Sequence, residues 1–184
     1  LAGAHVRLEP VAERHVPALL DAAADAEVWR WLPWPQPRDE VGMRALLETV
    51  RAMAIPFAQV EVAKGRAVGM TCFLDVQPRN RTIEVGGTWL GRPWWRTAIN
   101  TEAKLLMLGH AFDALGANRV ALKTDARNTR SQEAITRLGA QREGVLRRHM
   151  VRPDGSLRDT VMFSVIREEW PAVRDRLRAR LAAG

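Results

Sequence analysis

The stretch that decides the fold is residues 86–103, GGTWLGRPWWRTAINTEA. It has the pattern of a strand broken by two glycines, a short loop rich in Trp and Arg, and a helix that begins at once. Adjacent glycines inside a strand mark a bulge or the close approach of another backbone or a ligand. A helix N-terminus presents N–H groups and the positive end of its dipole to an anion. The stretch therefore predicts a site for a long, phosphate-bearing ligand beside a broken strand.

Strands and helices alternate on both sides of this stretch. We expect strands at 5–9, 57–62, 67–75, 82–90 and 119–124, and helices at 11–24, 39–53, 101–115, 128–138 and 170–181. Segments 141–151 and 160–165 flank the turn residues PDGS at 153–156 and predict a C-terminal β-hairpin. With no repeat or linker between them, these elements predict one α/β (α+β) domain over residues 1–184, with helices on both faces of a mixed sheet.

Composition restricts the function classes. The 184 residues are 47% hydrophobic and 27% charged, which is ordinary for a chain with one globular core. No apolar run is long enough to cross a bilayer, and the single Cys72 fits a reducing compartment, so we expect a cytoplasmic protein without membrane contact. The net charge of +7 admits nucleic acid, an acidic surface or a polyanionic small molecule as partner, and charge alone does not choose among them.

The sequence argues against two kinds of site. A module that reads RNA by stacking needs a basic stripe interleaved with aromatic residues, and we find none, so a ribosome- or RNA-binding module is the weaker alternative. No spacing of His, Cys, Asp and Glu suggests a bound metal.

The chain resembles the GCN5-related N-acetyltransferases (GNAT), and among them the RimJ/RimL-type branch that acetylates N-terminal amines of ribosomal proteins. The resemblance is carried by residues 5–20 (HVRLEPVAERHVPALL), by 82–112, and by 125–170 (DARNTRSQEAITRLGAQREGVLRRHMVRPDGSLRDTVMFSVIREEW). The most specific match is an Asn-x-x-Ser that opens a helix ending in Leu-Gly-Ala, followed by Glu-Gly. The resemblance implies a twisted, mostly antiparallel sheet of about seven strands.

The resemblance also implies an activity. It predicts that acetyl-coenzyme A is the cofactor and that its acetyl group passes directly to a primary amine in a ternary complex. The acceptor would be a protein N-terminus, a polyamine or a small amine. A second copy of the chain, forming a homodimer, is a further expected partner.

One loop departs from the family pattern. Where the wider family has Arg or Gln, two residues, Gly, one residue, and then Gly or Ala, this chain has WRTAIN at 95–100, so both glycines are replaced. This loss keeps a non-catalytic acyl-coenzyme A sensor as an alternative. The residues at the predicted helix start that would hold the pyrophosphate are Arg96, Thr97, Ala98, Asn100 and Thr101. The bland alternative is that Arg96 and Thr97 only cap a buried helix.

Three further groups are expected to meet the cofactor. The resemblance implies that the backbone of Trp89 and Leu90 pairs with the pantetheine arm as an added strand. Asn128 and Ser131, one helical turn apart, are by themselves an N-cap and a first-turn residue. The resemblance implies that Asn128 bonds to the cofactor arm and that Ser131 lies near its sulfur. Many relatives use Tyr as the acid that protonates the thiolate, but this chain has no tyrosine, so Ser131 is the expected acid.

Two residues are candidates for the base that deprotonates the amine. Glu84 precedes the glycine break and should face away from Ile83 and Val85, towards a cleft, although a surface Glu fits the pattern equally well. His149 has a suitable ordinary pKa and lies in the first hairpin strand, which lines the acceptor side in this branch.

A tryptophan cluster follows the first helix. Trp29, Trp31 and Trp34 lie in the proline-rich segment VWRWLPWPQPRDE at 28–40. Large aromatic residues commonly fill a core, but Trp rings can also wall a pocket for a cationic acceptor. The interpretation that we adopt is the acceptor pocket, with the core as its alternative.

Overall fold

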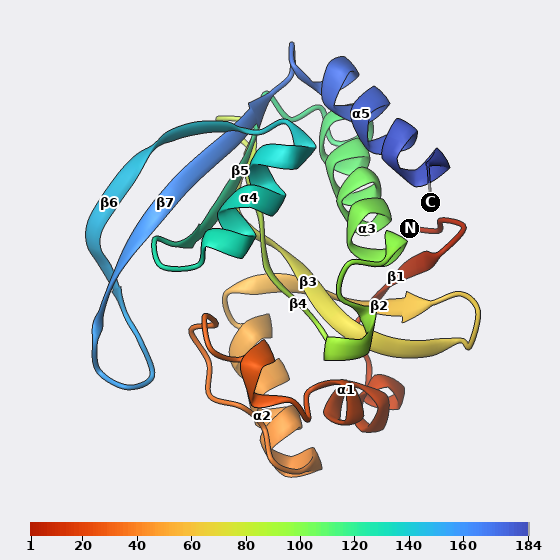
Figure 1. Cartoon of the computed structure of the whole chain (residues 1–184), viewed down its shortest axis with the longest axis vertical. Coiled ribbons are helices and arrows are strands. Elements are labelled where there is room, and N and C mark those ends of the chain that lie inside the picture. Colours follow the sequence, from red (N-terminus) through yellow and green to blue (C-terminus); the bar gives the residue numbers. More distant parts are fainter. Residues whose placement is uncertain (184) are drawn as a thin grey trace.

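The structure of the chain is a computed structural model that describes residues 1–183. Its strands form one sheet in the order β1-β2-β3-β4-β5-β7-β6, antiparallel except for the parallel pair β4–β5 (Figure 1). The strands are β1 (Val6–Pro10), β2 (Ala54–Glu61), β3 (Arg66–Gln77), β4 (Thr82–Leu90), β5 (Arg119–Asp125), β6 (Gln141–Val151) and β7 (Leu157–Ile166). The helices are α1 (Val16–Ala22), α2 (Glu40–Arg51), α3 (Ala98–Gly109), α4 (Thr129–Leu138) and α5 (Trp170–Ala182). The predicted mixed α/β architecture is confirmed.

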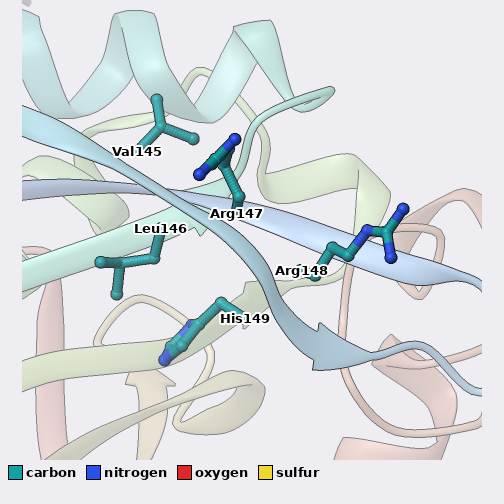
Figure 2. A pocket seen from close by; sticks show the side chains of 5 residues that line it. All are labelled: Val145, Leu146, Arg147, Arg148 and His149. Atoms are coloured by element: carbon teal, nitrogen blue, oxygen red, sulfur yellow. The ribbon is translucent and has the colours of Figure 1, made fainter.

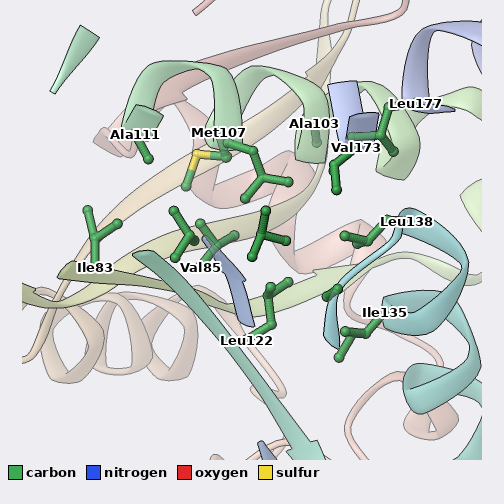
Figure 3. Packing of buried hydrophobic residues seen from close by; sticks show 14 of the residues in the cluster. Ile83, Val85, Ala103, Met107, Ala111, Leu122, Ile135, Leu138, Val173 and Leu177 are labelled. Carbon is green, nitrogen blue, oxygen red and sulfur yellow. The ribbon is translucent and has the colours of Figure 1, made fainter. Parts of the chain in front are cut away.

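Helices cover both faces of the sheet, with a hydrophobic cluster under each layer. On one face, α1 and α2 pack over β2 and β3, with Met43, Leu47 and Met70 fully buried between them. On the other face, α3, α4 and α5 pack over a larger cluster (Figure 3). The labelled members of this larger cluster are Ile83, Val85, Ala103, Met107, Ala111, Leu122, Ile135, Leu138, Val173 and Leu177.

Strands β4 and β5 pair for only a short distance. Thr82, Ile83 and Glu84 pair with residues 119–121, and the pairing ends there although β4 continues to Leu90. Just beyond the last pair, Gly87 adopts a φ of +57°, which favours glycine, and the register between β3 and β4 shifts. The glycine pair therefore marks a bulge, and a gap opens between two neighbouring strands.

The hairpin of β6 and β7 curves away from the body of the sheet (Figure 1). Its strands shift register between Leu146 and Met150, where the extra residues of β6 form a bulge. Arg148 within the bulge has a φ of +50°, and its N–H donates to Asp159 Oδ1 at 2.7 Å. The buried residues of α4 and α5 belong to the cluster on the face of this hairpin that carries Val161 and Phe163, opposite the face that carries Thr160.

Two predicted helices differ from the structure by more than two residues at an end. The segment 11–24 is a 3-10 turn at Glu13–His15 followed by α1, because Pro17 has no N–H with which to continue an α-helical ladder across that point. Helix α3 begins three residues earlier than predicted, because Ile99 packs in the core one turn before Ala103. It then passes into a π-helical turn at His110–Ala114.

Candidate active site

The N-terminus of α3 keeps its first-turn N–H groups free of a side-chain cap. Thr97 is the N-cap residue, but its hydroxyl donates to the carbonyl of Trp94 at 2.8 Å and does not cap the helix. Arg96 has a φ of +63°, a conformation that favours glycine, so the loop keeps a glycine-like turn without a glycine. Ala98, Asn100 and Thr101 then form the first turn. The uncapped N–H groups and the dipole of α3 suit an anionic ligand.

Three arginines gather beside this helix end. Arg92 and Arg130 stack on Trp95, with their guanidinium carbons 4.9 and 3.6 Å from the ring centroid. Burial lowers the pKa of Arg130, and the charges of Arg92 and Arg96 lower it further against the opposing effect of Glu27. Because like charges repel, such a cluster is stabilised by a polyanion bound between them. These residues therefore fit the diphosphate of a nucleotide cofactor.

The end of β4 that borders the gap directly precedes the loop that carries Arg92 and Arg96. Trp89 and Leu90 pair with Met70 and Gly69 of β3 on one side, and beyond Glu84 β4 has no pairing with β5 on its other side. The indole of Trp89 is buried in the α1–α2 core, so only the backbone of β4 faces the gap. Unpaired backbone along a strand suits the addition of an extended ligand.

Helix α4 begins on the far side of the same gap. Asn128 is its N-cap, and its Oδ1 accepts a hydrogen bond from the N–H of Ser131 at 3.1 Å. The cap that the sequence suggested is therefore present, and the amide NH2 of Asn128 remains available as a donor. Ser131 is half-buried in the first turn. Because Arg130 of α4 stacks on Trp95, the start of α4 lies beside the loop that precedes α3.

Beyond the part that α1 and α2 cover, the face of the sheet opposite α3, α4 and α5 carries buried charges on β4, β5 and β7, and we call this part the open face. Glu84 lies there, since Ile83 and Val85 point into the core under α3. Its carboxylate is buried and forms an ion pair with Lys123 on β5, with Nζ and Oε2 2.9 Å apart. The sequence predicted this face for Glu84 but missed its partner Lys123, although Lys123 follows the same alternation along β5.

His149 lies on the open-face side of the hairpin. Together with residues 145–148 it borders a hollow of about 740 Å³ (Figure 2). Figure 2 shows Leu146 and His149 pointing to one side of β6 and Val145 and Arg147 to the other. The Nδ1 atom of His149 lies 3.2 Å from Thr160 Oγ1. His149 and Glu84 therefore share a face but come from different strands.

The three tryptophans of the loop after α1 have different environments. Trp29 and Trp34 are 6% and 7% exposed and pack in the α1–α2 core, where Trp29 donates from Nε1 to the carbonyl of Ala23. Burial thus favours the core alternative for these two rings. Trp31 is half-buried, and Arg127 lies over its ring at 5.3 Å, so this loop reaches the start of α4. Among the three, Trp31 alone keeps appreciable ring surface for an acceptor.

A buried lysine lies beneath the β4 bulge on the α3 side. Lys104 Nζ donates to Thr88 Oγ1 at 2.6 Å and lies 3.5 Å from Thr71 Oγ1. Burial lowers the pKa of Lys104 to about 8, with a smaller opposing effect from Cys72. Residue spacing gave no signal for this lysine, because it lies in an otherwise apolar stretch of α3.

Residues 1–183 contain neither a candidate metal site nor a helix that could span a membrane. That part of the chain holds no group of three or more His, Cys, Asp or Glu side chains placed to bind a metal ion. None of its helices combines the length and apolar character needed to cross a membrane.

Comparisons with known proteins agree with this geometry. The family model of the acetyltransferase (GNAT) domain matches residues 5–141. A GCN5-related N-acetyltransferase from Brucella melitensis is 32% identical, with a TM-score of 0.92 over 98% of this chain and 84% of that one. The uncharacterised N-acetyltransferase p20 of Bacillus licheniformis is 25% identical over 80% of this chain and 84% of its own length.

A more distant structure shows the same fold. RimJ of Mycobacterium smegmatis, solved in complex with CoA-disulfide, is 23% identical with a TM-score of 0.80, covering 96% of this chain and 92% of that one. Family membership is shown by the match to the family model and by the 32% identity to the Brucella structure. The protein belongs to the GNAT family and is an N-acetyltransferase.

Proposed function

We propose that this enzyme moves the acetyl group of acetyl-coenzyme A directly to a primary amine in a ternary complex, without a covalent acyl-enzyme. The observation that carries the proposal is the gap between β4 and β5, which begins after Glu84 and lies between the bulge of β4 and the start of α4. At the α3 end of this gap, an uncapped helix N-terminus meets Arg92, Arg96 and Arg130. When bound, acetyl-coenzyme A supplies the acetyl group as a thioester.

Different residues around the gap would bind the pyrophosphate and the extended arm of the cofactor. Arg96 and the first turn of α3, from Ala98 to Thr101, would hold the pyrophosphate by charge and by N–H donors. The backbone of Trp89 and Leu90 and the amide of Asn128 would hold the extended arm from opposite sides. Within residues 1–183, the first turn of α3 and the amide NH2 of Asn128 have no side-chain partner, whereas the carbonyls of Trp89 and Leu90 already accept hydrogen bonds from Gln59 Nε2 and Trp95 Nε1.

Residues of the open face and of the start of α4 would move the protons. We assign Glu84 as the base that takes a proton from the ammonium form of the acceptor, with His149 as the alternative base. Ser131 would return a proton to the leaving thiolate from the start of α4. Trp31 would border the acceptor, which we expect to be a protein N-terminus, a polyamine or a small amine.

A non-catalytic acyl-coenzyme A sensor is the second candidate. The observation that favours it is the ion pair between Glu84 and Lys123, which occupies the carboxylate that the catalytic assignment needs. A sensor would bind the cofactor through the same arginines but would release no thiol.

Two measurements on the full chain separate the candidates. Acetyl-coenzyme A should raise the melting temperature, since it binds only the folded protein, and Arg96→Ala should reduce this shift more at low salt than at high salt. Thiol release with a panel of primary amines should then exceed the release without amine. A melting shift without amine-dependent thiol release supports the sensor, and the absence of any shift contradicts both candidates.

A further inference from the structure

Arg158 of β7 is a buried cation without a carboxylate partner among residues 1–183. It is 7% exposed, and no Asp or Glu oxygen in that part of the chain lies within ion-pair distance of its guanidinium. Its guanidinium makes one hydrogen bond there, from Nε to Thr160 Oγ1 at 3.1 Å. Buried arginine charges are ordinarily paired and hydrogen-bonded, because an isolated charge is costly to remove from water. The two NH2 groups of Arg158 make no hydrogen bond within residues 1–183 and keep some contact with solvent, so they are available to a ligand.

The neighbouring arginine of the hairpin shows what a satisfied site looks like. Arg152 binds Asp125 through Nε and Nη2, both at 2.7 Å, and its Nη1 reaches Ser156 and the carbonyl of Leu157. Asp125 is thus already occupied, and Glu84 is occupied by Lys123. Both acids of the open face that act on Arg158 are therefore already paired with other cations. The positive charge of Arg158 is left without a neutralising partner in the described part of the chain.

Arg158 lies with the residues assigned to the acceptor. Arg158 lies two residues before Thr160 in β7, so the side chains of both point to the open face. Thr160 also contacts His149 there. The charges of Asp125 and Glu84 both act on Arg158, raising a pKa that burial and Arg152 lower. The unpaired guanidinium is therefore near the proposed base and on the same face as His149.

We infer that Arg158 binds an oxyanion carried by the acceptor, a carboxylate or a phosphate close to the amine that is acetylated. This inference rests on the proposed function and narrows its acceptor to amines that bear an anionic group. The planar fork of a guanidinium binds two oxygens of such a group at once, and a charged hydrogen bond of this kind is about twice as strong as a neutral one. An oxyanion at this position would neutralise the excess charge while Glu84 faces the amine.

Matched acceptors test the inference in the full-length enzyme. We would compare β-alanine with β-alaninamide, which differ in the carboxylate, and phosphoethanolamine with ethanolamine, which differ in the phosphate. Arg158→Gln should lower kcat/KM for the preferred anionic acceptor by about 10- to 100-fold and leave its neutral counterpart nearly unchanged. Comparing these ratios between enzyme forms cancels the different amine pKa values. Arg142→Gln, which removes an exposed arginine from the same hairpin, should leave both members of each pair nearly unchanged.

A second readout does not depend on turnover. With coenzyme A present, the preferred anionic acceptor should raise the melting temperature of the wild type and not that of Arg158→Gln. Without ligands, Arg158→Gln should unfold no more easily than the wild type, because the substitution removes an uncompensated charge. Equal losses for both members of a pair, or a wild type without preference for either anion, would overturn the inference and leave the proposed function standing. An anion-dependent melting shift that needs Arg158, in an enzyme that acetylates none of the amines, would keep this site and contradict the proposed function. Neither a shift nor acetylation would contradict both.

Discussion

The two faces of strands β4 and β5 differ in the kind of residue that they bury. On the face under α3, Ile83, Val85 and Leu122 are at most 5% exposed and belong to one continuous hydrophobic cluster. On the open face, the alternate residues of the same strands include Glu84 and Lys123, an ion pair. One face is filled by its own helices, whereas the other holds charges that its own residues only partly neutralise.

This contrast separates the residues that maintain the fold from those that carry out the reaction. Apolar burial contributes about 25 cal/mol per Å² of area removed from water and needs no ligand to be complete. Buried charges cost free energy unless they are paired, so a face that retains them is suited to a charged ligand. Substitutions on the two faces should therefore affect different measurements.

The largest expected effect lies on the face under α3, α4 and α5, which we call the closed face. Phe112 is 1% exposed and stacks on Trp170 with ring centroids 5.5 Å apart. Phe112→Ala should lower the free energy of unfolding by about 3–5 kcal/mol, because it removes buried area and leaves a cavity. Urea denaturation measures this change. Leu115→Ala, at a nearby residue that is 55% exposed, is the control and should cost less than about 0.5 kcal/mol. Equal effects of the two substitutions would contradict the contrast between filled and exposed positions.

The next effect lies on the open face and concerns turnover. Glu84→Gln should reduce kcat by about 10²-fold or more at neutral pH, the lower range for one acid–base group, and by less at high pH, where solvent deprotonates the amine. Its effect on unfolding should be smaller than that of Phe112→Ala, because Lys123 is 26% exposed and can turn to water. A pH–rate profile with one accepted amine measures this.

His149→Gln provides the comparison for that profile. If this variant shows the pH-dependent loss and Glu84→Gln does not, His149 is the base and the assignment of Glu84 is wrong. Ser131→Ala should lower turnover in either case while leaving cofactor affinity nearly unchanged, whereas Asn128→Ala should mainly weaken cofactor binding.

The contrast between the faces was predictable from the sequence where it follows a period of two. Ile83, Glu84 and Val85 alternate in character, and the predicted bounds of β4 agree with those observed, because the glycine break and the flanking turn both constrain the strand. Trp29 and Trp34 were harder to place. Aromatic residues in an irregular loop have no periodicity, so the sequence cannot tell a core position from a pocket wall.

Side-chain contacts between segments far apart in the sequence could not be predicted from residue patterns. The stacking of Arg130 on Trp95 joins the start of α4 to the loop before α3 across more than 30 residues of chain. Alternation along β7 places Arg158 on the open face, but whether an acid neutralises it depends on which partners Asp125 and Glu84 have already taken. The sequence pattern predicts which face a side chain points to. Only the three-dimensional structure shows whether its charge is paired.

Lys104 is the exception that sharpens the comparison, because it places a charge on the closed face. Burial lowers its pKa from 10.5 to about 8, so below about pH 8 the lysine is protonated in both states and folding bears the full cost of the buried charge. Between about pH 8 and 10.5 the unfolded chain binds the extra proton, so the free energy of unfolding rises with pH there, by about 3 kcal/mol in all. Lys104→Met should lack this rise, which denaturation across that range would measure. Parallel curves for the two proteins would show that Lys104 titrates normally.

The smallest effect distinguishes conformation from charge at the end of the cofactor gap. Arg96 has a φ of +63°, which costs about 1–2 kcal/mol for a residue with a Cβ and nothing comparable for glycine. Arg96→Gly should therefore unfold with a free energy about 1 kcal/mol higher than Arg96→Ala, even after glycine's greater flexibility in the unfolded chain is subtracted. Both variants lose the guanidinium, so both should bind acetyl-coenzyme A more weakly than the wild type, and the difference should shrink at high salt. Equal stability of the two variants would mean that the loop relaxes away from the left-handed turn. Wild-type affinity in both would mean that the helix N-terminus and the other two arginines bind the phosphates without Arg96.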